Sequence, residues 1–521
     1  MGADLGGKPF HFVKAWLDHP GFSEEVKKSW NSSGINGWAS FVFKEKLKRL
    51  KDRLRIWNKE VFGNIDKNVE DLENEILVLD RCDDVFGLEE REICRRNEAS
   101  ARLLIALKNR KSLLQQKARL RWLKEGDVNS SFFHKSIARR RKRNELAGLV
   151  INGDWVDDPS RVKTEVRRHF REQFQSRGRG ELDVPADLVR GRLSEAQGDA
   201  LISAFSEAEV KDAVWSCDSD RSPGPDGFNF GFIMAFWEVI KDDIFKVLRE
   251  LHRNGEFSKG CNTSFIVLIP KKDGASELNH FWPISLIGCL YKIIAKVLAN
   301  RIRPVMETVI GDCQSAFVKG RNILDGIVIL NEVIEEAKKK KKKRFIFKVD
   351  FAKAYDSVEW HFLLLMMERM NFPSNWRSWI LECISSASAN VLINGSLTEI
   401  FHFERGIRQG DPLSPFLFLI IAEGLNALVG RAVERDLLRP VEVGRERVSI
   451  FHLQYADDTL FVVDGNLDNA KVIKEGGAAF ELSWDEGWGG SADWEFGMMW
   501  WIKSVGDLKG RRLRLFPLEV G

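Results

Sequence analysis

The stretch that decides the fold reads Ile450-Phe451-His452-Leu453-Gln454-Tyr455-Ala456-Asp457-Asp458-Thr459-Leu460-Phe461-Val462-Val463. Two apolar, strand-prone runs flank a short polar centre, which predicts a β-hairpin with two adjacent carboxylates at its tip. Such a tip can hold Asp457 rigidly against a divalent metal ion. Asp is also a common turn residue, so the same pattern is compatible with an ordinary hairpin turn.

A second apolar strand pattern, residues 344–349, ends in a carboxylate at Asp350, and a helical pattern follows it. A carboxylate at a strand end can meet a hairpin tip on the neighbouring strand. Two metal ions about 4 Å apart can then activate a 3′-hydroxyl and stabilise the leaving pyrophosphate. Hard oxygen ligands without His or Cys beside them favour Mg²⁺ over zinc, with Mn²⁺ as the alternative ion.

A third stretch interrupts the chain before an apolar helix expected at 416–428, and it reads Gly406-Ile407-Arg408-Gln409-Gly410-Asp411-Pro412-Leu413-Ser414-Pro415. In their order, spacing and strand context, the motifs at 350–355, 409–415 and 455–458 resemble three successive palm motifs of a reverse transcriptase. The longer sequence around these motifs resembles the non-LTR (LINE-type) retrotransposon kind of reverse transcriptase, particularly the plant branch. The alternative within the same class of enzyme is a group II intron-like or telomerase-like reverse transcriptase. The sequence around Asp226 and Gln314 argues against it.

The resemblance implies RNA-templated DNA synthesis by nucleotidyl transfer, with an RNA template, a DNA primer and deoxynucleoside triphosphates as partners. Asp350 and Asp457 are then expected to hold two Mg²⁺ ions, and Asp458 to support the cluster by ligation or electrostatics. An alternative from another class is a catalytically dead copy of the element that only binds nucleic acid.

The resemblance also implies a nucleotide pocket. Tyr355 is expected to be the steric gate against a ribose 2′-hydroxyl, and the alternative is a helix-packing aromatic. The family usually has an Arg directly before Pro-Ile-Ser-Leu to hold the triphosphate, but this chain has Trp282, which can stack yet cannot neutralise phosphate. The other expected nucleotide-binding residues are Phe351, Ala352, Gln409, Gly410, Lys271 and Lys272, of which the two lysines would partly replace that Arg.

Basic residues are concentrated in two runs, 139–143 and 338–344, although the net charge is only +4. The lysine run is expected to be a solvated loop, because it directly precedes the Asp350 strand. The arginine run is compatible with a solvated surface or with salt-sensitive phosphate contacts. The expected nucleic-acid-binding residues are Arg139, Arg140, Arg141, Arg321 and Arg408.

Composition adds broad limits. The seven cysteines are scattered and form no Cys-x-x-Cys pair, which indicates reduced thiols, an intracellular protein and no zinc site. The N-terminus has no signal-peptide pattern, and the apolar run 416–422 is too short to span a bilayer, so no membrane partner is expected. The resemblance implies a nuclear location, and the oligomeric state stays open.

The expected fold is α+β, a right-hand polymerase with fingers and palm, preceded by a basic helical region, with the thumb missing or degenerate. Helical patterns near 41–61 and 69–79 are expected to form an antiparallel pair, and Asn152-Gly153 predicts a hairpin turn. The expected domains are a remnant after a lost endonuclease domain (1–40), the basic helical region (41–143), an N-terminal extension and fingers entry (144–260), reverse transcriptase fingers and palm (261–465), and a divergent Gly/Trp-rich tail (466–521) of a truncated copy.

Overall fold

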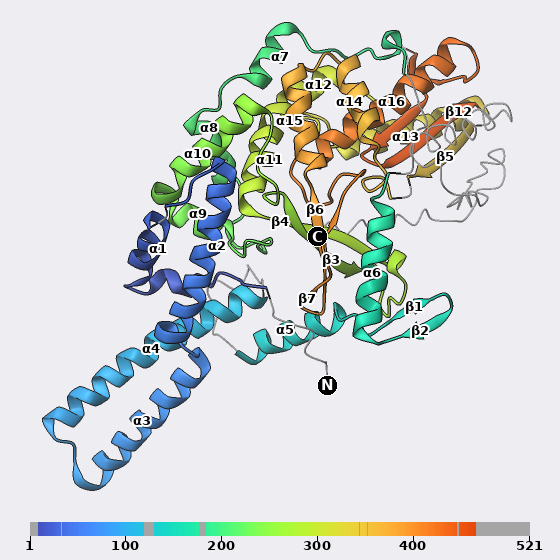
Figure 1. Ribbon diagram of the computed structural model, residues 1–521. Coiled ribbons are helices and arrows are strands. Elements are labelled where there is room, and N and C mark those ends of the chain that lie inside the picture. Colours follow the sequence, from blue (N-terminus) through green and yellow to red (C-terminus); the bar gives the residue numbers. More distant parts are fainter. Residues whose placement is uncertain are drawn as a thin grey trace.

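The computed structural model describes residues 9–32, 34–118, 130–176, 184–342, 344–351, 353–444 and 447–464. Ala352 and the predicted tail at 466–521 lie outside these ranges, as does everything predicted for a thumb after residue 464. Within them the chain contains both helices and strands, which confirms the α+β class (Figure 1).

The N-terminal region is helical. Its elements are η1 (Lys14–Asp18), α1 (Phe22–Asn31), α2 (Ala39–Trp57), the π-helical turn η2 (Asn58–Phe62), α3 (Ile65–Phe86), α4 (Glu90–Ala118) and α5 (Ser130–Arg143). The apolar stripe of α2 is buried against α1 and α10 (Trp237–Asn254) because Phe43, Leu47, Leu50 and Leu54 recur on one helical face.

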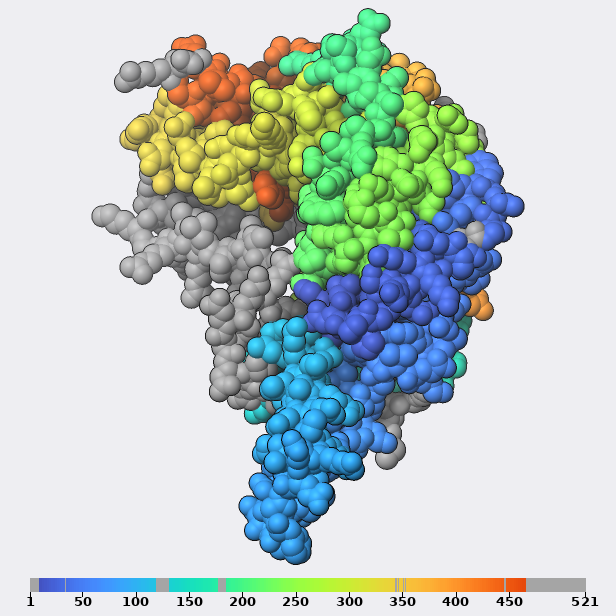
Figure 2. All heavy atoms as spheres, turned by 90° about the vertical axis from the view of Figure 1, so that its left-hand side faces the viewer, coloured from blue at the N-terminus to red at the C-terminus, as the bar shows by residue number. Residues whose placement is uncertain are grey.

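Both predicted helices at 41–61 and 69–79 are present, but the prediction that they pair with each other is wrong. The helix α3 packs along α4 and not along α2. Acidic residues of α3 face basic residues of α4, and ion pairs join Glu75 to Arg95 at 2.6 Å and Asp66 to Arg110 at 3.1 Å. The preceding helical turn η2 ends at Gly63, which has a positive φ, and Asn64 then caps the start of α3. The chain therefore begins α3 as a new helix after this bend. The α3–α4 pair projects from the wider body of the protein (Figures 1 and 2).

The strands β1 (Leu149–Ile151) and β2 (Asp154–Val156) form the predicted hairpin, with Asn152 and Gly153 both at positive φ. The helices and turns that follow are α6 (Pro159–Gln173), η3 (Ala186–Leu188), α7 (Glu195–Ile202), α8 (Glu207–Trp215), α9 (Phe230–Ala235), α10, η4 (Leu278–His280), α11 (Cys289–Ile302), η5 (Arg303–Val305) and α12 (Met306–Val309).

A five-stranded sheet is built around β3 (Thr263–Pro270). It pairs antiparallel with β4 (Phe281–Ile287) and parallel with β6 (Ser388–Ile393), and β6 also pairs with β7 (Ser396–Leu397) and β8 (Phe401–His402). Apolar residues of β3 and β6 share a buried cluster with Val166 and Phe170 of α6. The helix α6 is therefore fixed to this sheet, in agreement with Figure 1.

A three-stranded antiparallel sheet has the order β11-β12-β5, formed by β11 (His452–Tyr455), β12 (Asp458–Asp464) and β5 (Arg344–Asp350). Beside it lie α13 (Ile323–Lys340), β9 (Val441–Val443) and β10 (Val448–Ile450), and Val333, Val441 and Val462 share one buried cluster. The lysine run was predicted to be a loop, and for its first residues this prediction is wrong. Lys338 to Lys340 form the last turn of α13. Lysine is a good helix former, and cations are favourable at a helix C-terminus.

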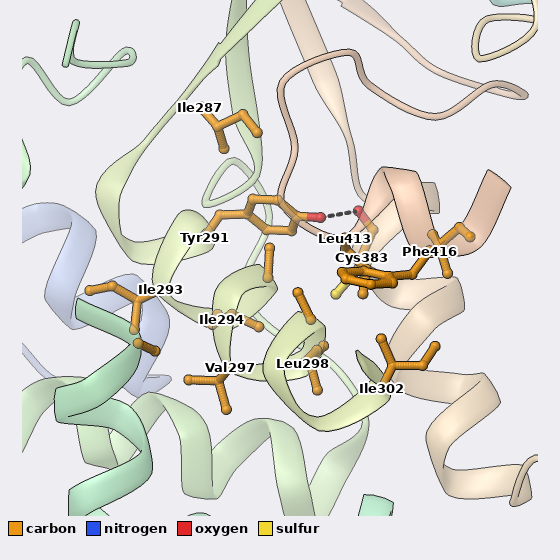
Figure 3. Packing of buried hydrophobic residues seen from close by; sticks show 14 of the residues in the cluster. Ile287, Tyr291, Ile293, Ile294, Val297, Leu298, Ile302, Cys383, Leu413 and Phe416 are labelled. Atoms are coloured by element: carbon orange, nitrogen blue, oxygen red, sulfur yellow. Dashed lines mark hydrogen bonds between the residues drawn. The ribbon is translucent and has the colours of Figure 1, made fainter. Parts of the chain in front are cut away.

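The helices α14 (Trp360–Arg369), α15 (Ser374–Ser385) and α16 (Ser414–Glu434) pack between the two sheets and the helical body. By length and composition α16 could cross a bilayer, but 67% of its most apolar window is buried inside the protein. It therefore serves as a core helix here. Figure 3 shows part of the neighbouring core, where Phe416 of α16 belongs to the same buried cluster as Tyr291 and Leu298 of α11.

Candidate active site

The predicted hairpin tip is present. The register pairs Tyr455 with Asp458, so that Ala456 and Asp457 form a two-residue turn. Ala456 has a φ of 55°, in the left-handed region that such a turn requires at its first position. This conformation costs a non-glycine residue roughly 1–2 kcal/mol, so the surrounding contacts have to hold it.

The register also brings the predicted carboxylate positions together. The Cα of Asp458 is paired with that of Asp350 across β12 and β5, and Asp457 directly precedes Asp458. The prediction that Asp350 and the hairpin tip lie on adjacent strands of one sheet is therefore confirmed. Lys348 is also close, since its Nζ lies 2.8 Å from Asp458 Oδ1, so one oxygen of this carboxylate already faces a cation.

Tyr355 lies between the hairpin tip and α16. Its ring stacks on Phe418 at 5.0 Å and 11°, and it is partly buried. Burial raises the pKa of the Tyr355 hydroxyl, and the charge of Asp457 raises it further. The side chain thus packs against a helix and is within electrostatic reach of Asp457 at the tip.

The Gln409-Gly410 turn lies against β4. The Gln409 carbonyl accepts a hydrogen bond from the Ser285 N–H at 2.9 Å. Gly410 has a φ of 99°, and a Cβ there would come within 3.0 Å of the Ser285 carbonyl oxygen. A glycine is therefore required for this close approach, and the loop joins the five-stranded sheet to α16.

These positions match a known family. Residues 269–480 match the model of the family described as reverse transcriptase (RNA-dependent DNA polymerase). The chain carries a reverse transcriptase domain of the non-LTR retrotransposon kind. It is 26% identical to the transposon TX1 uncharacterized 149 kDa protein of Xenopus laevis over 88% of this chain and 35% of that protein.

Two further relatives are similar to this non-LTR reverse transcriptase domain. The Pol polyprotein from the type-1 retrotransposable element R2 of Nasonia vitripennis is 28% identical over 62% of this chain and 29% of its own length. A putative 115 kDa protein in the type-1 element R1DM of Drosophila melanogaster is 27% identical over 69% and 34%. The chain thus spans about a third of the length of these relatives.

Asp356 was not singled out from the sequence, yet it is buried beside the Gln409 loop of the reverse transcriptase domain. Its carboxylate accepts a hydrogen bond from Gln173 Nε2 at 2.8 Å and is also hydrogen-bonded by the Gln409 side chain. Burial raises its pKa to about 7, although Lys353 and Lys271 act in the opposite direction. The available signal is a second carboxylate directly after Tyr355, in the motif that begins at Asp350.

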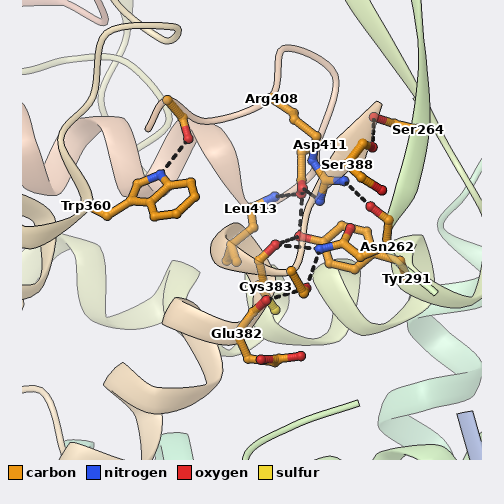
Figure 4. Close-up of polar contacts among 12 residues, drawn as sticks. Asn262, Ser264, Tyr291, Trp360, Glu382, Cys383, Ser388, Arg408, Asp411 and Leu413 are labelled. Carbon is orange, nitrogen blue, oxygen red and sulfur yellow. Dashed lines mark hydrogen bonds and ion pairs between the residues drawn. The ribbon is translucent and has the colours of Figure 1, made fainter. Parts of the chain in front are cut away.

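The prediction that Arg408 binds nucleic acid is corrected by its position. The residue is only 5% exposed, and its guanidinium pairs with Asp411 at 3.0 Å, donates to the Asn262 carbonyl and lies 4.3 Å from the Tyr291 ring (Figure 4). Asp411 also accepts hydrogen bonds from the Tyr291 hydroxyl at 2.8 Å and the Leu413 N–H at 3.0 Å. Arg408 therefore holds the loop before α16 from inside the protein.

Arg321 is corrected in the same way. Its guanidinium donates to the carbonyl oxygens of Gly311, Gln314 and Ile310, and it pairs with Asp312. The side chain is mostly buried. These contacts close the loop 310–314, so the guanidinium is directed into the protein and not toward a template.

The remaining predicted residues lie at several places. Lys271 and Lys272 are exposed after β3, and Trp282 on β4 is 49% exposed. Phe351 is buried behind the end of β5. The arginines predicted to bind nucleic acid on α5, Arg139, Arg140 and Arg141, are exposed, and Arg140 also donates to the Ala118 carbonyl.

A metal site is supported by the strand register and by the donor chemistry. Among the side chains that the structure describes, no group of three His, Cys, Asp or Glu residues lies close enough to hold an ion, and Asp350 is not among those side chains. The backbone nevertheless brings Asp350, Asp457 and Asp458 to one end of one sheet. An all-oxygen set of this kind suits a divalent cation such as Mg²⁺.

Proposed function

We propose that this chain is the RNA-directed DNA polymerase part of a LINE-type retrotransposon protein. The observation that carries the proposal is the pairing of Asp350 with Asp458 beside the Asp457 turn. Asp350 and Asp457 would hold two Mg²⁺ ions, with Asp458 in support; Mn²⁺ is the alternative ion. The ions, when bound, would activate the primer 3′-hydroxyl and neutralise charge on the triphosphate.

The substrates are an RNA template, a DNA primer and deoxynucleoside triphosphates. The three-stranded sheet would be the palm and the five-stranded sheet part of the fingers. Tyr355, next to the Asp457 charge, would exclude a ribose 2′-hydroxyl, and Gln409-Gly410 would line the pocket opposite it. Lys271 and Lys272 would face the triphosphate with Phe351 and Ala352 contributing backbone.

Template affinity would come from exposed cations and not from Arg321 or Arg408, since both of those are directed inward. The exposed arginines on α5 remain, and Arg139 and Arg141 are the better placed of the three because Arg140 has a carbonyl partner. Such phosphate contacts weaken steeply as salt increases. A protein with these substrates is expected in the nucleus.

Primer extension on an RNA template with the purified chain and Mg²⁺ tests the proposal. The wild-type chain should extend the primer, and Asp457→Asn should reduce extension by at least about 1,000-fold, since several kcal/mol of transition-state stabilisation depend on the ions. The matched control is Asp84→Asn on the exposed end of α3, which should extend like wild type. Equal extension by wild type and Asp457→Asn would refute the metal assignment.

A catalytically dead copy that only binds nucleic acid is the second candidate. It is favoured by exposed Trp282 at the position where the family usually has a phosphate-binding Arg. This candidate predicts salt-sensitive binding of an RNA–DNA duplex without extension. The variant Trp282→Arg tests whether the missing phosphate-binding Arg is the only defect of the site. It should increase primer extension only if the other residues of the site are intact.

A further inference from the structure

A buried glutamine holds the backbone of the hairpin tip. Gln314 lies in the loop before α13 and is only 1% exposed. Its Oε1 accepts a hydrogen bond from the Ala456 N–H at 2.9 Å, and its Nε2 donates to the Ala456 carbonyl at 3.3 Å. One amide thus binds both backbone groups of a single turn residue, so it fixes the peptide planes on either side of Ala456.

The residue that it holds is the strained one. Ala456 has the positive φ of the turn, and Asp457 follows it directly. A non-glycine residue keeps such a conformation only where the surroundings impose it. Rotation of the peptide between Ala456 and Asp457 would move the Asp457 side chain, so the Gln314 contacts also restrict that carboxylate.

The loop that carries Gln314 is itself anchored from several sides. Its backbone pairs with β11, where the Gln454 N–H donates to the Cys313 carbonyl at 2.7 Å and the Gln454 carbonyl accepts from the Ser315 N–H at 2.9 Å. Arg321 donates to the Gln314 carbonyl at 2.8 Å.

On the other side of the same loop, buried Glu423 of α16 accepts from the Gly311 N–H at 3.1 Å. The amide of Gln314 is therefore a rigid contact and not the end of a mobile loop.

We propose that Gln314 is a positioning residue that sets the place of the Asp457 carboxylate through the Ala456 backbone. It would touch neither substrate nor metal ion. The inference rests on the proposed polymerase function for its catalytic consequence, while the clamp itself can be tested without any activity.

The first test compares Gln314→Met with Gln116→Met. Gln116 is a matched control because it makes the same kind of clamp elsewhere, accepting from the Lys14 N–H at 3.0 Å and donating to the Phe12 carbonyl at 2.8 Å. Hydrogen–deuterium exchange of peptides spanning the hairpin should become at least about tenfold faster in Gln314→Met, because the Ala456 N–H loses its acceptor. It should be unchanged in Gln116→Met.

The kinetic test separates positioning from binding. A displacement of about 1 Å at a reacting group can cost about 100-fold. We therefore expect Gln314→Met to lower kcat for primer extension about 10- to 100-fold with KM for the nucleotide within about twofold of wild type, the pattern of an interaction used in the transition state. Mn²⁺ affinity measured by electron paramagnetic resonance should fall in the same variant.

A second variant, Gln314→Glu, guards against simple misfolding. A protonated carboxyl has one donor and one acceptor like the amide, and burial favours that protonated form. The kcat of Gln314→Glu relative to wild type should rise at least about fivefold between about pH 8 and pH 6, while the ratio for Gln314→Met stays flat.

The ionisable groups already present around this site are the same in all three proteins. They are Cys313 and Arg321 on the same loop, Glu423 on α16, His452 on β11 and Asp457 itself. Ratios to wild type remove their contribution.

The outcomes are distinct. If the wild-type chain extends no primer, the proposed function fails, and hydrogen exchange and Mn²⁺ affinity still decide whether Gln314 holds the turn. Unchanged exchange of the hairpin and unchanged Mn²⁺ affinity in Gln314→Met would overturn the inference. So would an active wild type whose kcat is unaffected by Gln314→Met, or a Gln314→Glu ratio that is independent of pH.

Discussion

Removing Arg408 and Asp411 together should destabilise the protein by much less than the sum of the two single losses. Each side chain is buried, and the ion pair is supported by Tyr291, Leu413 and the Asn262 carbonyl. Removing one partner of a buried pair costs about 3–5 kcal/mol, because the other charge stays in the interior without compensation.

The structure places the two single variants at different ends of that range. In Arg408→Met, Asp411 keeps its donors from Tyr291 and Leu413, so we expect a loss of about 3 kcal/mol. In Asp411→Leu, the guanidinium loses its anion and both donors lose their acceptor, so we expect about 5 kcal/mol. The double variant removes both charges and should cost only about 4 kcal/mol, a coupling of about 4 kcal/mol between the sites.

The assay is the free energy of unfolding from urea titrations, followed by both far-ultraviolet circular dichroism and tryptophan fluorescence. Arg190→Met, which breaks the exposed pair with Glu434, is the control and should change the free energy by less than about 1 kcal/mol. Losses in the two buried single variants that add within about 0.5 kcal/mol in the double variant would refute the reasoning.

Three further predictions concern the site and its support. Tyr355→Ala should raise the ratio of ribo- to deoxynucleotide incorporation at least about tenfold while Tyr355→Phe keeps the wild-type ratio, and an unchanged ratio in both would remove the gate assignment. The pKa of Asp356 is about 7 in the folded protein and about 4 unfolded, so wild-type stability should fall as pH rises from about 4 to 7. In Asp356→Asn that slope in urea titrations should be smaller, and an identical slope would contradict the shift. Gly406→Ala should cost more than about 2 kcal/mol by urea titration, because its Cβ would meet the Asp356 carbonyl oxygen at 2.6 Å. Gly444→Ala, equally left-handed but in open space, should cost about 1 kcal/mol, and equal losses would show that strain alone matters.

The elements predicted best are those whose signal is local. Alternating apolar residues around Asp457, and Asn152-Gly153 between two short apolar runs, fix both hairpins within a few residues. Asp350 was placed at a strand end for the same reason, and the pairing of β5 with β12 then follows from the sheet.

Other features depend on contacts that lie far apart in sequence. The sequence does not show whether a charged residue beside a motif faces solvent or the core. Arg321 and Arg408 were therefore predicted to bind nucleic acid, although both are directed into the protein. The bond between Gln173 and Asp356 spans 183 positions, so neither residue predicts the other. The partner of α3 could not be read from apolar spacing, because its charge complement to α4 is the distinguishing feature.

The order in which the strands join has a consequence for synthesis of the chain. β3 and β4 are neighbours in sequence, but β3 also needs β6, which starts at Ser388, and β5 needs β12, which ends at Asp464. Pairing of strands so far apart is slow, and an apolar strand that waits for its partner offers an open edge to other chains. A polypeptide that stops between residues 394 and 457 would therefore leave β5 exposed, so interrupted translation should yield aggregates and not a smaller soluble protein.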